Sequence, residues 1–354
     1  MKVLVIGSGA SISTKDVENG IYEALQRAGI DTKIYLLDVR LSNAYDWLVH
    51  NWENNEEVQP RPVWADAIYR GSVEALELAL RYDVDWILMI SGMYFHPDVV
   101  TLMRRAHLHT AVLLTESPYM DQQQQNFVLE VDGAWTNEIT SIPILQEANP
   151  NIQYMRHAYD PLLHHPATEE DIEANEMPAY DVVMVGSGFE ERIDLLEQVD
   201  WTGINLGLYG HWELLSEHSP LQPFLKGELI SNRKTTQLYA RAKLGLNIYR
   251  TSKFYELGGE HIKGAKSMNP RAYELAACQI PAIANFRQEQ EDTLGDGVTQ
   301  FTDAKSLECA IKELLGNPEL AKERAYKAYK RIQGHTFDER VKQILNTLGM
   351  ERQD

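Results

Sequence analysis

The sequence predicts an α/β protein made of two doubly wound domains in series. Strands and helices alternate through both halves of the 354-residue chain, as expected for parallel sheets with helices on both faces. Each half opens on a buried-type strand and a Gly-rich turn, Gly7-Ser8-Gly9 in the first and Gly186-Ser187-Gly188 in the second. Because a single core rarely grows past about 250–300 residues, the length also favours two domains.

In the first half, Val17, Ile21 and Leu25 recur at helical spacing and predict a helix that ends at Gly29. The stretch after the second strand is expected to be irregular, up to a helix at about 66–80. Four strands are predicted in this half, at 2–6, 32–37, 86–90 and 110–114.

A polar, acidic stretch bounded by Pro161 and Pro178 is the best candidate for a linker. The pattern then starts again, with a helix opening near Glu190 and strands at 181–185, 205–209, 244–248 and 281–284. The C-terminal part is helical, at 310–315, 319–332 and 337–348. We therefore expect a first domain at 1–160, a second, ligand-binding domain at 161–335, and a final helix at 336–354 that packs back on the first domain.

Charge and cysteine use exclude several classes of protein. The formal net charge of −19 would repel nucleic acid and anionic membranes. No apolar run reaches the roughly 20 residues that a membrane span needs, and the N-terminus enters a strand without a cleavable signal. Cys278 and Cys309 are expected as small buried side chains in a reducing compartment. A cytoplasmic protein with no membrane partner is predicted.

The most informative stretch runs from Lys266 to Cys278. A loop turns into a short helix at Asn269-Pro270, since proline suits the first helical turn, where its missing N–H would be unpaired anyway. The amides of this turn, from Met268 onward, and the helix dipole form an anion site, with Arg271 beside it and Glu274 one turn on. A phosphate at the helix start and a sugar hydroxyl at the glutamate is the arrangement that a nucleotide sugar needs. A capped helix with solvated Arg and Glu side chains is the alternative.

The two Gly-rich turns predict different things. Neither completes the dinucleotide G-x-G-x-x-G pattern, because Ile12 and Glu191 stand at the third glycine position. The first turn is interpreted as structural, whereas the turn of Gly186, Ser187 and Gly188 could lay backbone amides against a diphosphate, with Arg192 following at helical distance. A local group of basic residues in this acidic protein also favours a diphosphate: Arg250, Lys263, Lys266 and Arg271.

Candidate catalytic residues follow the strands of the first domain. Glu116 comes directly after the strand at 110–114, at the edge where ligands bind, and could accept a proton from a hydroxyl if the site is dry enough to raise its pKa. Glu116 could instead cap a helix or pair with an arginine. His96, after the preceding strand, is the second candidate base. The loop residues assigned to the acceptor side are Gly9, Ser11, Tyr94 and Tyr119.

No metal site is predicted. Asp83 and Asp85 have the spacing of a metal-binding Asp-x-Asp, but they precede a strand, away from the expected ligand edge, and are interpreted as a solvated turn. Several histidines lack a cysteine or carboxylate at ligand spacing, so solvated or capping roles are expected for them. They are His107, His109, His157, His164 and His165.

Together these blocks resemble the CgeB-like glycosyltransferases, a family of bacteria and their phages named for a spore-maturation protein. The resemblance runs from about Tyr180 to Leu348 and is strongest at 269–278, Asn-Pro-Arg-Ala-Tyr-Glu-Leu-Ala-Ala-Cys. It includes the blocks at 181–187, 209–212 and 246–250. In the first domain it rests on the first strand and on Glu116-Ser117-Pro118-Tyr119.

The resemblance implies a GT-B fold, with two Rossmann-like domains facing each other across a cleft and a helical C-terminal tail. The second domain would hold a nucleotide-diphosphate sugar, with Glu274 on the ribose hydroxyls. Arg271, Arg250 and the Ser187-Gly188 turn would contact the diphosphate. Because helix dipoles and basic side chains neutralise the leaving diphosphate in such folds, no metal or other cofactor is expected.

Two positions depart from the family pattern. Gln279 stands where the family usually has glycine, and in a left-handed conformation a non-glycine residue costs about 1 kcal/mol. Lys266 stands eight positions before Glu274, where many related retaining enzymes carry a second glutamate. The sugar-side contacts and the anomeric outcome therefore stay open.

The sequence thus predicts a hexosyl- or pentosyltransferase that moves a sugar, preferably from a UDP-sugar, to an acceptor hydroxyl in the cleft. The acceptor stays open between a glycan, a small molecule, a protein and a modified DNA base. One alternative is a phage-type DNA glycosyltransferase acting on a hydroxymethylated base, which the net charge of −19 opposes. Another is a non-catalytic nucleotide or nucleotide-sugar binding protein. A nicotinamide oxidoreductase ranks last, because both glycine fingerprints are incomplete.

Overall fold

The computed structural model describes residues 1–9, 14–54, 60–227 and 230–349. The chain divides into two compact units: Met1–Arg156 with Phe337–Asp354 form the first domain, and His157–Thr336 form the second. Each domain contains a parallel six-stranded sheet, which confirms the predicted fold class. In the part described, no helix is both long enough and apolar enough to cross a bilayer.

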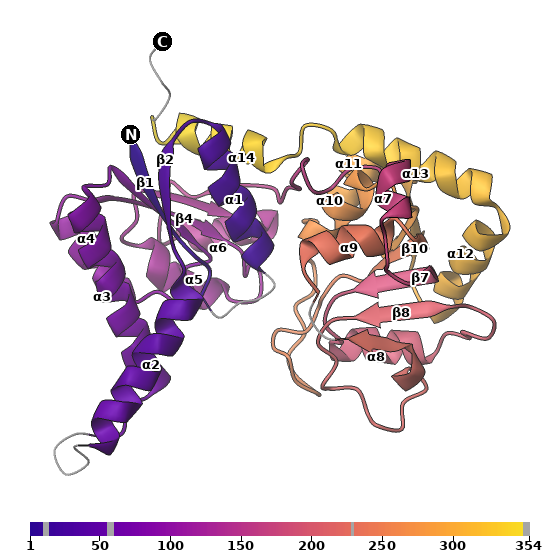
Figure 1. Ribbon diagram of the computed structural model, residues 1–354, viewed down its shortest axis with the longest axis horizontal. Helices are drawn as coiled ribbons and strands as arrows, with labels where there is room; N and C mark the ends of the chain where they lie inside the picture. Colours follow the sequence, from indigo (N-terminus) through magenta and orange to yellow (C-terminus); the bar gives the residue numbers. More distant parts are fainter. Residues whose placement is uncertain (10–13, 55–59, 228–229, 350–354) are drawn as a thin grey trace. The chain divides into compact units, whose positions relative to one another are not determined.

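The first sheet has the strand order β2-β1-β3-β4-β5-β6, which changes direction between β1 and β3. Its strands are β1 (Lys2–Ile6), β2 (Asp31–Tyr35), β3 (Trp86–Ile90), β4 (His109–Leu114), β5 (Gly133–Thr136) and β6 (Gln153–Tyr154). The helices of this domain are α1 (Lys15–Arg27), α2 (Leu37–Glu53), α3 (Trp64–Tyr82), α4 (Pro97–Arg105), α5 (Asp121–Val128), α6 (Ile142–Gln146) and α14 (Phe337–Thr347) (Figure 1).

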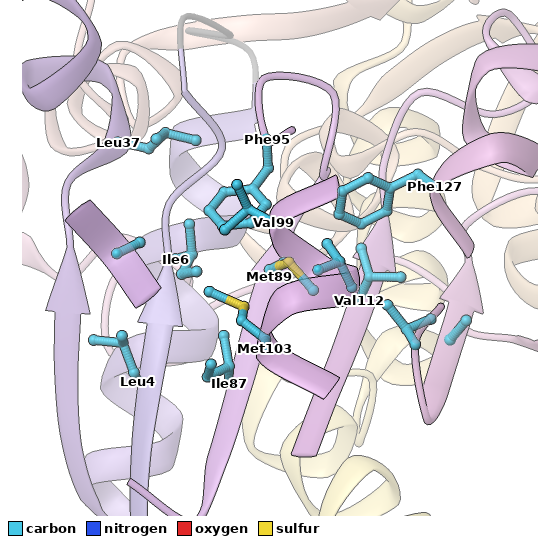
Figure 2. Packing of buried hydrophobic residues seen from close by; sticks show 14 of the residues in the cluster. Leu4, Ile6, Leu37, Ile87, Met89, Phe95, Val99, Met103, Val112 and Phe127 are labelled. Atoms are coloured by element: carbon cyan, nitrogen blue, oxygen red, sulfur yellow. The ribbon is translucent and has the colours of Figure 1, made fainter. Parts of the chain in front are cut away.

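Apolar side chains from alternate positions of adjacent strands pack on one face of this sheet, because successive strand residues face opposite sides. Figure 2 shows part of this core, in which side chains of the strands pack with side chains of the helices: Leu4, Ile6, Ile87, Met89 and Val112 from strands, Val99 and Met103 from α4, and Phe127 from α5. The last helix, α14, belongs to the same domain. Its Arg340 donates a hydrogen bond from Nε to the carbonyl of Arg156 at 2.9 Å.

The expectation of an irregular stretch after the second strand is wrong, because residues Leu37–Glu53 form α2. Leu37, Leu41 and Ala44 are buried at helical spacing. Leu37 and Leu41 also lie against Gly71 of α3. Figure 1 shows α2 and α3 as a hairpin that extends away from the sheet. Packing against α3 therefore stabilises a helix whose own sequence pattern is weak.

The second sheet has the order β12-β11-β10-β7-β8-β9. Its strands are β7 (Tyr180–Val185), β8 (Leu206–Tyr209), β9 (Leu225–Gly227), β10 (Ala242–Asn247), β11 (Ala282–Asn285) and β12 (Val298–Phe301). Its helices are α7 (Glu169–Glu173), α8 (Glu190–Glu197), α9 (Asn232–Tyr239), α10 (Pro270–Ala277), α11 (Gln288–Leu294), α12 (Ala304–Gly316) and α13 (Pro318–Ile332). Cys309, which was expected to be buried, is exposed on α12. The strand order changes direction between β7 and β10, and ligands of such sheets bind at that point, beyond the carboxyl ends of the strands.

Arg192 of α8 joins the two strands that flank this point. Its Nε donates to the carbonyl of Ile248, after β10, at 2.9 Å, and its Nη1 donates to the carbonyl of Ser187, after β7, at 2.7 Å. Arg192 is buried and its guanidinium also lies over the Phe189 ring. The expectation that Arg192 contacts a diphosphate is therefore corrected: the side chain is turned inward and holds the two strand ends together.

Gln279 adopts the left-handed conformation that the sequence made possible, with φ of +54°. It follows α10, whose last residue is Ala277 and whose C-cap is Cys278. Glycine is the residue that adopts this conformation without steric cost.

We expect Gln279→Gly to stabilise the second domain by about 0.5–1 kcal/mol, because the relief of strain exceeds the extra unfolded-state entropy of glycine. Urea unfolding of the variant measures the change. Gln279→Ala is the control, and it should match the wild type because alanine retains the Cβ. An equal gain in the free energy of unfolding in both variants, or a loss in Gln279→Gly, would contradict the claim that Gln279 is strained.

We expect Arg192→Met to destabilise the second domain by about 2–4 kcal/mol, because two carbonyls lose charged hydrogen bonds in a buried position. The exposed Arg81 of α3, changed to Met, is the control and should alter stability by less than about 0.5 kcal/mol. Urea unfolding measures both variants. An Arg192→Met variant as stable as the wild type that has lost nucleotide binding would return Arg192 to the diphosphate.

Candidate functional site

The residues predicted to bind a donor converge on the carboxyl edge of the second sheet. The turn at 186–188 follows β7, Arg250 follows β10, and Asn269 stands at the start of α10. Hydrogen bonds connect these loops: Arg192 donates to the carbonyls of Ser187 and Ile248, and the side-chain amides of Asn247 and Asn269 pair with each other. These positions therefore form one candidate site at the point where the strand order changes direction.

The Gly-rich turn after β7 offers one open amide. The N–H of Gly186 donates to the Tyr209 carbonyl at 2.8 Å, and that of Gly188 donates to the His211 carbonyl at 2.7 Å. Those two amides are not available to a diphosphate, which corrects that part of the expectation. The amide of Ser187 has no acceptor among the residues described. Packing also requires glycine at position 188, because a Cβ there would overlap the Trp212 ring.

Arg250 organises the loop that follows β10. Its Nε donates to the Ser252 carbonyl at 2.6 Å, its Nη2 donates to the Lys253 carbonyl, and its guanidinium lies 4.6 Å from the centre of the Phe189 ring. This arginine therefore reaches the expected edge, but it also holds the loop in place. A contact with a diphosphate would have to share the guanidinium with these carbonyls.

Glu191 anchors the same loop and was not predicted to do so. Its carboxylate accepts hydrogen bonds from the Thr251 amide at 2.6 Å and from the amide and hydroxyl of Ser252. Burial raises the pKa of Glu191, but these hydrogen bonds outweigh it, so that the net pKa lies below the ordinary value. The sequence used Glu191 only to reject a glycine fingerprint. An acidic residue in the first turn of a helix was the available signal.

The start of α10 is as predicted. Asn269 is the N-cap, its side-chain oxygen accepts from the Ala272 amide at 3.2 Å, and Pro270 is the first helical residue. The Asn269 amide group also pairs reciprocally with Asn247 at the end of β10, at 2.9 and 3.0 Å. Asn247 was not singled out in the sequence, because nothing local links the two positions.

The amide of Met268 is not open to an anion, which corrects a further expectation. It donates to Oε2 of Glu289 at 2.6 Å, and the Tyr273 hydroxyl donates to Oε1 of the same carboxylate at 2.7 Å. Glu289 is buried. Lys266 is exposed, and its carbonyl accepts from the Glu289 amide at 2.9 Å. The Glu289 carboxylate thus accepts from the Met268 amide, the amide that the sequence had assigned to an anionic ligand.

Arg271 and Glu274 form an ion pair on α10, three residues apart. Their side chains are 20% and 4% exposed, so the alternative of two solvated side chains is wrong. The guanidinium lies 5.9 Å from the centre of the Tyr239 ring. The attraction between the two charges offsets part of the cost of taking both out of water. An anion could draw Arg271 away and leave the carboxylate to accept hydroxyl hydrogens.

In the first domain, the structure brings together two of the acceptor-side residues. Gly9 has φ of +75°, and a Cβ there would overlap the Tyr94 side chain. These residues follow β1 and β3, the strands at which this sheet changes direction. Ser11, assigned to the same side, lies outside the described residues. The first Gly-rich turn is held by Glu18, whose carboxylate accepts from the Ser8 amide at 2.9 Å.

The two candidate bases differ in their surroundings. Glu116 is half-buried after β4, and its carbonyl accepts from the amides of Tyr119 and Met120 at 2.9 and 3.1 Å. His96 is the N-cap of α4, and its Nδ1 accepts from the Asp98 amide at 3.3 Å. His96 therefore has a structural role at a helix end. Glu116 and Tyr119 share one turn at the carboxyl edge of the sheet.

Within the described ranges, no three His, Cys, Asp or Glu side chains are grouped so as to hold a metal ion. Asp83 and Asp85 are exposed, as expected, and the Asp85 carboxylate accepts from the Lys2 amide at 2.7 Å. His164, expected to be solvated or to cap a helix, is instead 3% exposed.

A family model described as glycosyl transferase-like matches residues 186–346. No curated protein matches the sequence significantly. Three solved structures with the same fold cover 99% of this chain. Sucrose-phosphate synthase from Thermosynechococcus elongatus has a TM-score of 0.66 at 13% identity, over 99% of its length. HepE from Anabaena, in complex with UDP-glucose, has 0.65 at 14%, over 100%.

The third structure is an alpha-glucosyltransferase in complex with UDP-glucose and DNA, with a TM-score of 0.62 at 12% identity over 99% of its length. At these identities the likeness concerns the fold. The CgeB-like subfamily that the sequence resembled is not separately distinguished by these matches. Residues 186–346 match a glycosyl transferase-like family model, and the chain has the GT-B fold of these solved structures.

Proposed function

We propose that this protein is a glycosyltransferase that moves a sugar from a nucleotide-diphosphate donor, preferably a UDP-sugar, to an acceptor hydroxyl. The observation that carries the proposal is the Arg271–Glu274 pair on α10, at the ligand-binding edge of the glycosyl transferase-like domain. UDP is favoured as the donor nucleotide because HepE, which is similar in fold, was solved with UDP-glucose.

The diphosphate would lie at the N-terminus of α10, where the helix dipole favours negative charge. Arg271 would leave Glu274 and bind a phosphate oxygen instead. The planar guanidinium can form two parallel hydrogen bonds with a phosphate as it does with a carboxylate. The open amide of Ser187 would donate to the same group. These positive groups would stabilise the leaving diphosphate, so the proposed reaction does not depend on a metal ion.

Glu274, once released, would accept hydrogens from the ribose hydroxyls. Its position one turn into α10 separates it from the phosphate end of the site by about one helical pitch, roughly 5 Å. A nucleotide has its ribose next to its phosphates, so an anion site followed at that distance by a carboxylate fits the ligand.

The acceptor hydroxyl must lose a proton as it attacks the sugar. We propose Glu116 as the general base, because it follows β4 at the carboxyl edge of the sheet, where ligands of such folds bind. His96 is the second candidate, although its Nδ1 is engaged in capping α4. A DNA acceptor is disfavoured by the net charge of −19.

We expect Glu274→Ala and Arg271→Ala each to weaken UDP binding by at least about 10-fold, since each removes a charged hydrogen bond worth about 1.5–3 kcal/mol. Isothermal titration calorimetry with UDP, GDP, ADP and TDP measures the change. Glu308→Ala, which breaks an ion pair on α12 with Lys312, is the control and should bind like the wild type. Unchanged affinity for all four nucleotides in both site variants rules out the proposed donor site.

We expect Glu116→Gln to lower sugar transfer by at least about 100-fold while UDP affinity stays within about 2-fold, because a general base contributes 10²–10⁴ to the rate and does not touch the donor. Release of UDP from a UDP-sugar in the presence of acceptor measures transfer. His96→Asn is the matched variant, since asparagine still caps a helix. If Glu116→Gln kept full activity and His96→Asn lost sugar transfer, His96 and not Glu116 would be the general base.

A further inference from the structure

His164 is a buried histidine in the segment that leads from the first domain into α7. Its side chain is 3% exposed, and its Nδ1 accepts a hydrogen bond from the Asp160 amide at 3.3 Å. Burial, the largest effect, lowers the pKa of His164, so the ring is neutral at neutral pH. A neutral ring that accepts at Nδ1 must carry its hydrogen on Nε2.

That hydrogen has no acceptor among the described residues, although the Nε2 atom is buried. The Tyr239 hydroxyl lies beside the Arg271 guanidinium, and its own hydrogen also lacks an acceptor within the described part of the chain. A buried donor without a partner costs about 1–3 kcal/mol and requires an explanation. A ligand with oxygen acceptors would satisfy both groups.

Both groups lie close enough to the Arg271–Glu274 pair to feel its charges. Glu274 and Arg271 are the charged residues that act most strongly on the His164 ring. The backbone of His165 lies near the Cys278 sulfur, and Cys278 lies one turn beyond Glu274 on the same face of α10. Arg271 in turn lies over the Tyr239 ring. The segment at 164–165 and the end of α9 thus enclose the carboxylate that was assigned to a ribose.

We propose that His164 and Tyr239 complete a ribose subsite with Glu274, in which the carboxylate accepts the hydrogens of the 2′- and 3′-hydroxyls while Nε2–H and the Tyr239 hydroxyl donate to their oxygens. This inference rests on the proposed function, because it deepens the donor site described there. A cis-diol has two donors and four lone pairs, so a single carboxylate leaves its oxygens without donors. The two buried N–H and O–H groups supply them.

Such a subsite discriminates against 2′-deoxyribose. A site built to bond a hydroxyl rejects the analogue that lacks it, because the buried groups of the protein are then left unpaired. His164 and Tyr239 are thus specificity residues rather than catalytic ones. Their removal should reduce the preference for ribose more than it reduces binding as such.

Calorimetry with the ribo and 2′-deoxy forms of UDP, ADP and GDP tests the subsite through the ratio of the two affinities. We expect the wild type to prefer the ribo form of its nucleotide by at least about 10-fold. In His164→Leu and in Tyr239→Phe the ratio should fall to about 3 or less. His164→Gln should recover part of it, since a glutamine amide can place an N–H where Nε2 stood. Tyr180→Phe, which removes another buried hydroxyl bonded to Tyr209, is the control and should keep the wild-type ratio.

Equal weakening of the ribo and deoxy forms in both variants would mean a structural role and overturn the inference. If His164→Leu fails to fold, the Tyr239→Phe ratio decides alone, because that change removes one oxygen and keeps the ring. A wild type that binds ribo nucleotides without any preference over deoxy nucleotides refutes the subsite and leaves the proposed function standing. A wild type that binds none of the six nucleotides refutes both.

Discussion

The hydrogen bonds of the buried Arg192 guanidinium are the interaction on which the carboxyl edge of the second sheet depends. The guanidinium ties the turn after β7 to the end of β10, the two strands at which the second sheet changes direction. In a parallel sheet the carboxyl strand ends lead into loops. Arg192 joins two of these loops through charged hydrogen bonds to two carbonyls, which are stronger than neutral ones. The rest of the candidate site is built on this frame.

Several backbone amides at this edge donate to acidic side chains of the protein itself, and so are not open to a nucleotide. Glu191 takes those of Thr251 and Ser252, and Glu289 takes that of Met268. In a chain with a net charge of −19, these carboxylates hold loops in place and narrow the positions open to an anion. The helix start at Arg271 and the amide of Ser187 remain. In the proposed function, these two groups bind the diphosphate.

Much of the architecture could be predicted, because it follows from the pattern of apolar, glycine and proline residues within short stretches of the sequence. Strand periodicity located most strands of the two sheets, and the Asn269-Pro270 sequence located the start of α10. The missed helix α2 has a weak pattern of its own and depends on α3 for its packing. Partners were the least predictable feature. Arg192 bonds to carbonyls that follow two different strands, and the charge of Glu274 acts on His164 from more than a hundred positions away, so neither environment is visible in the sequence around it.

Hydrogen–deuterium exchange with and without UDP measures most directly whether this edge binds the donor. Amide exchange responds to every backbone group that a ligand covers or orders, and it needs no substitution in the site. We predict that UDP slows exchange at 186–190, 249–253 and 268–275 of the second domain, with little change along β12 and α12. Protection confined to other segments, with these three unchanged at saturating UDP, would contradict a nucleotide site at the strand ends that Arg192 holds together.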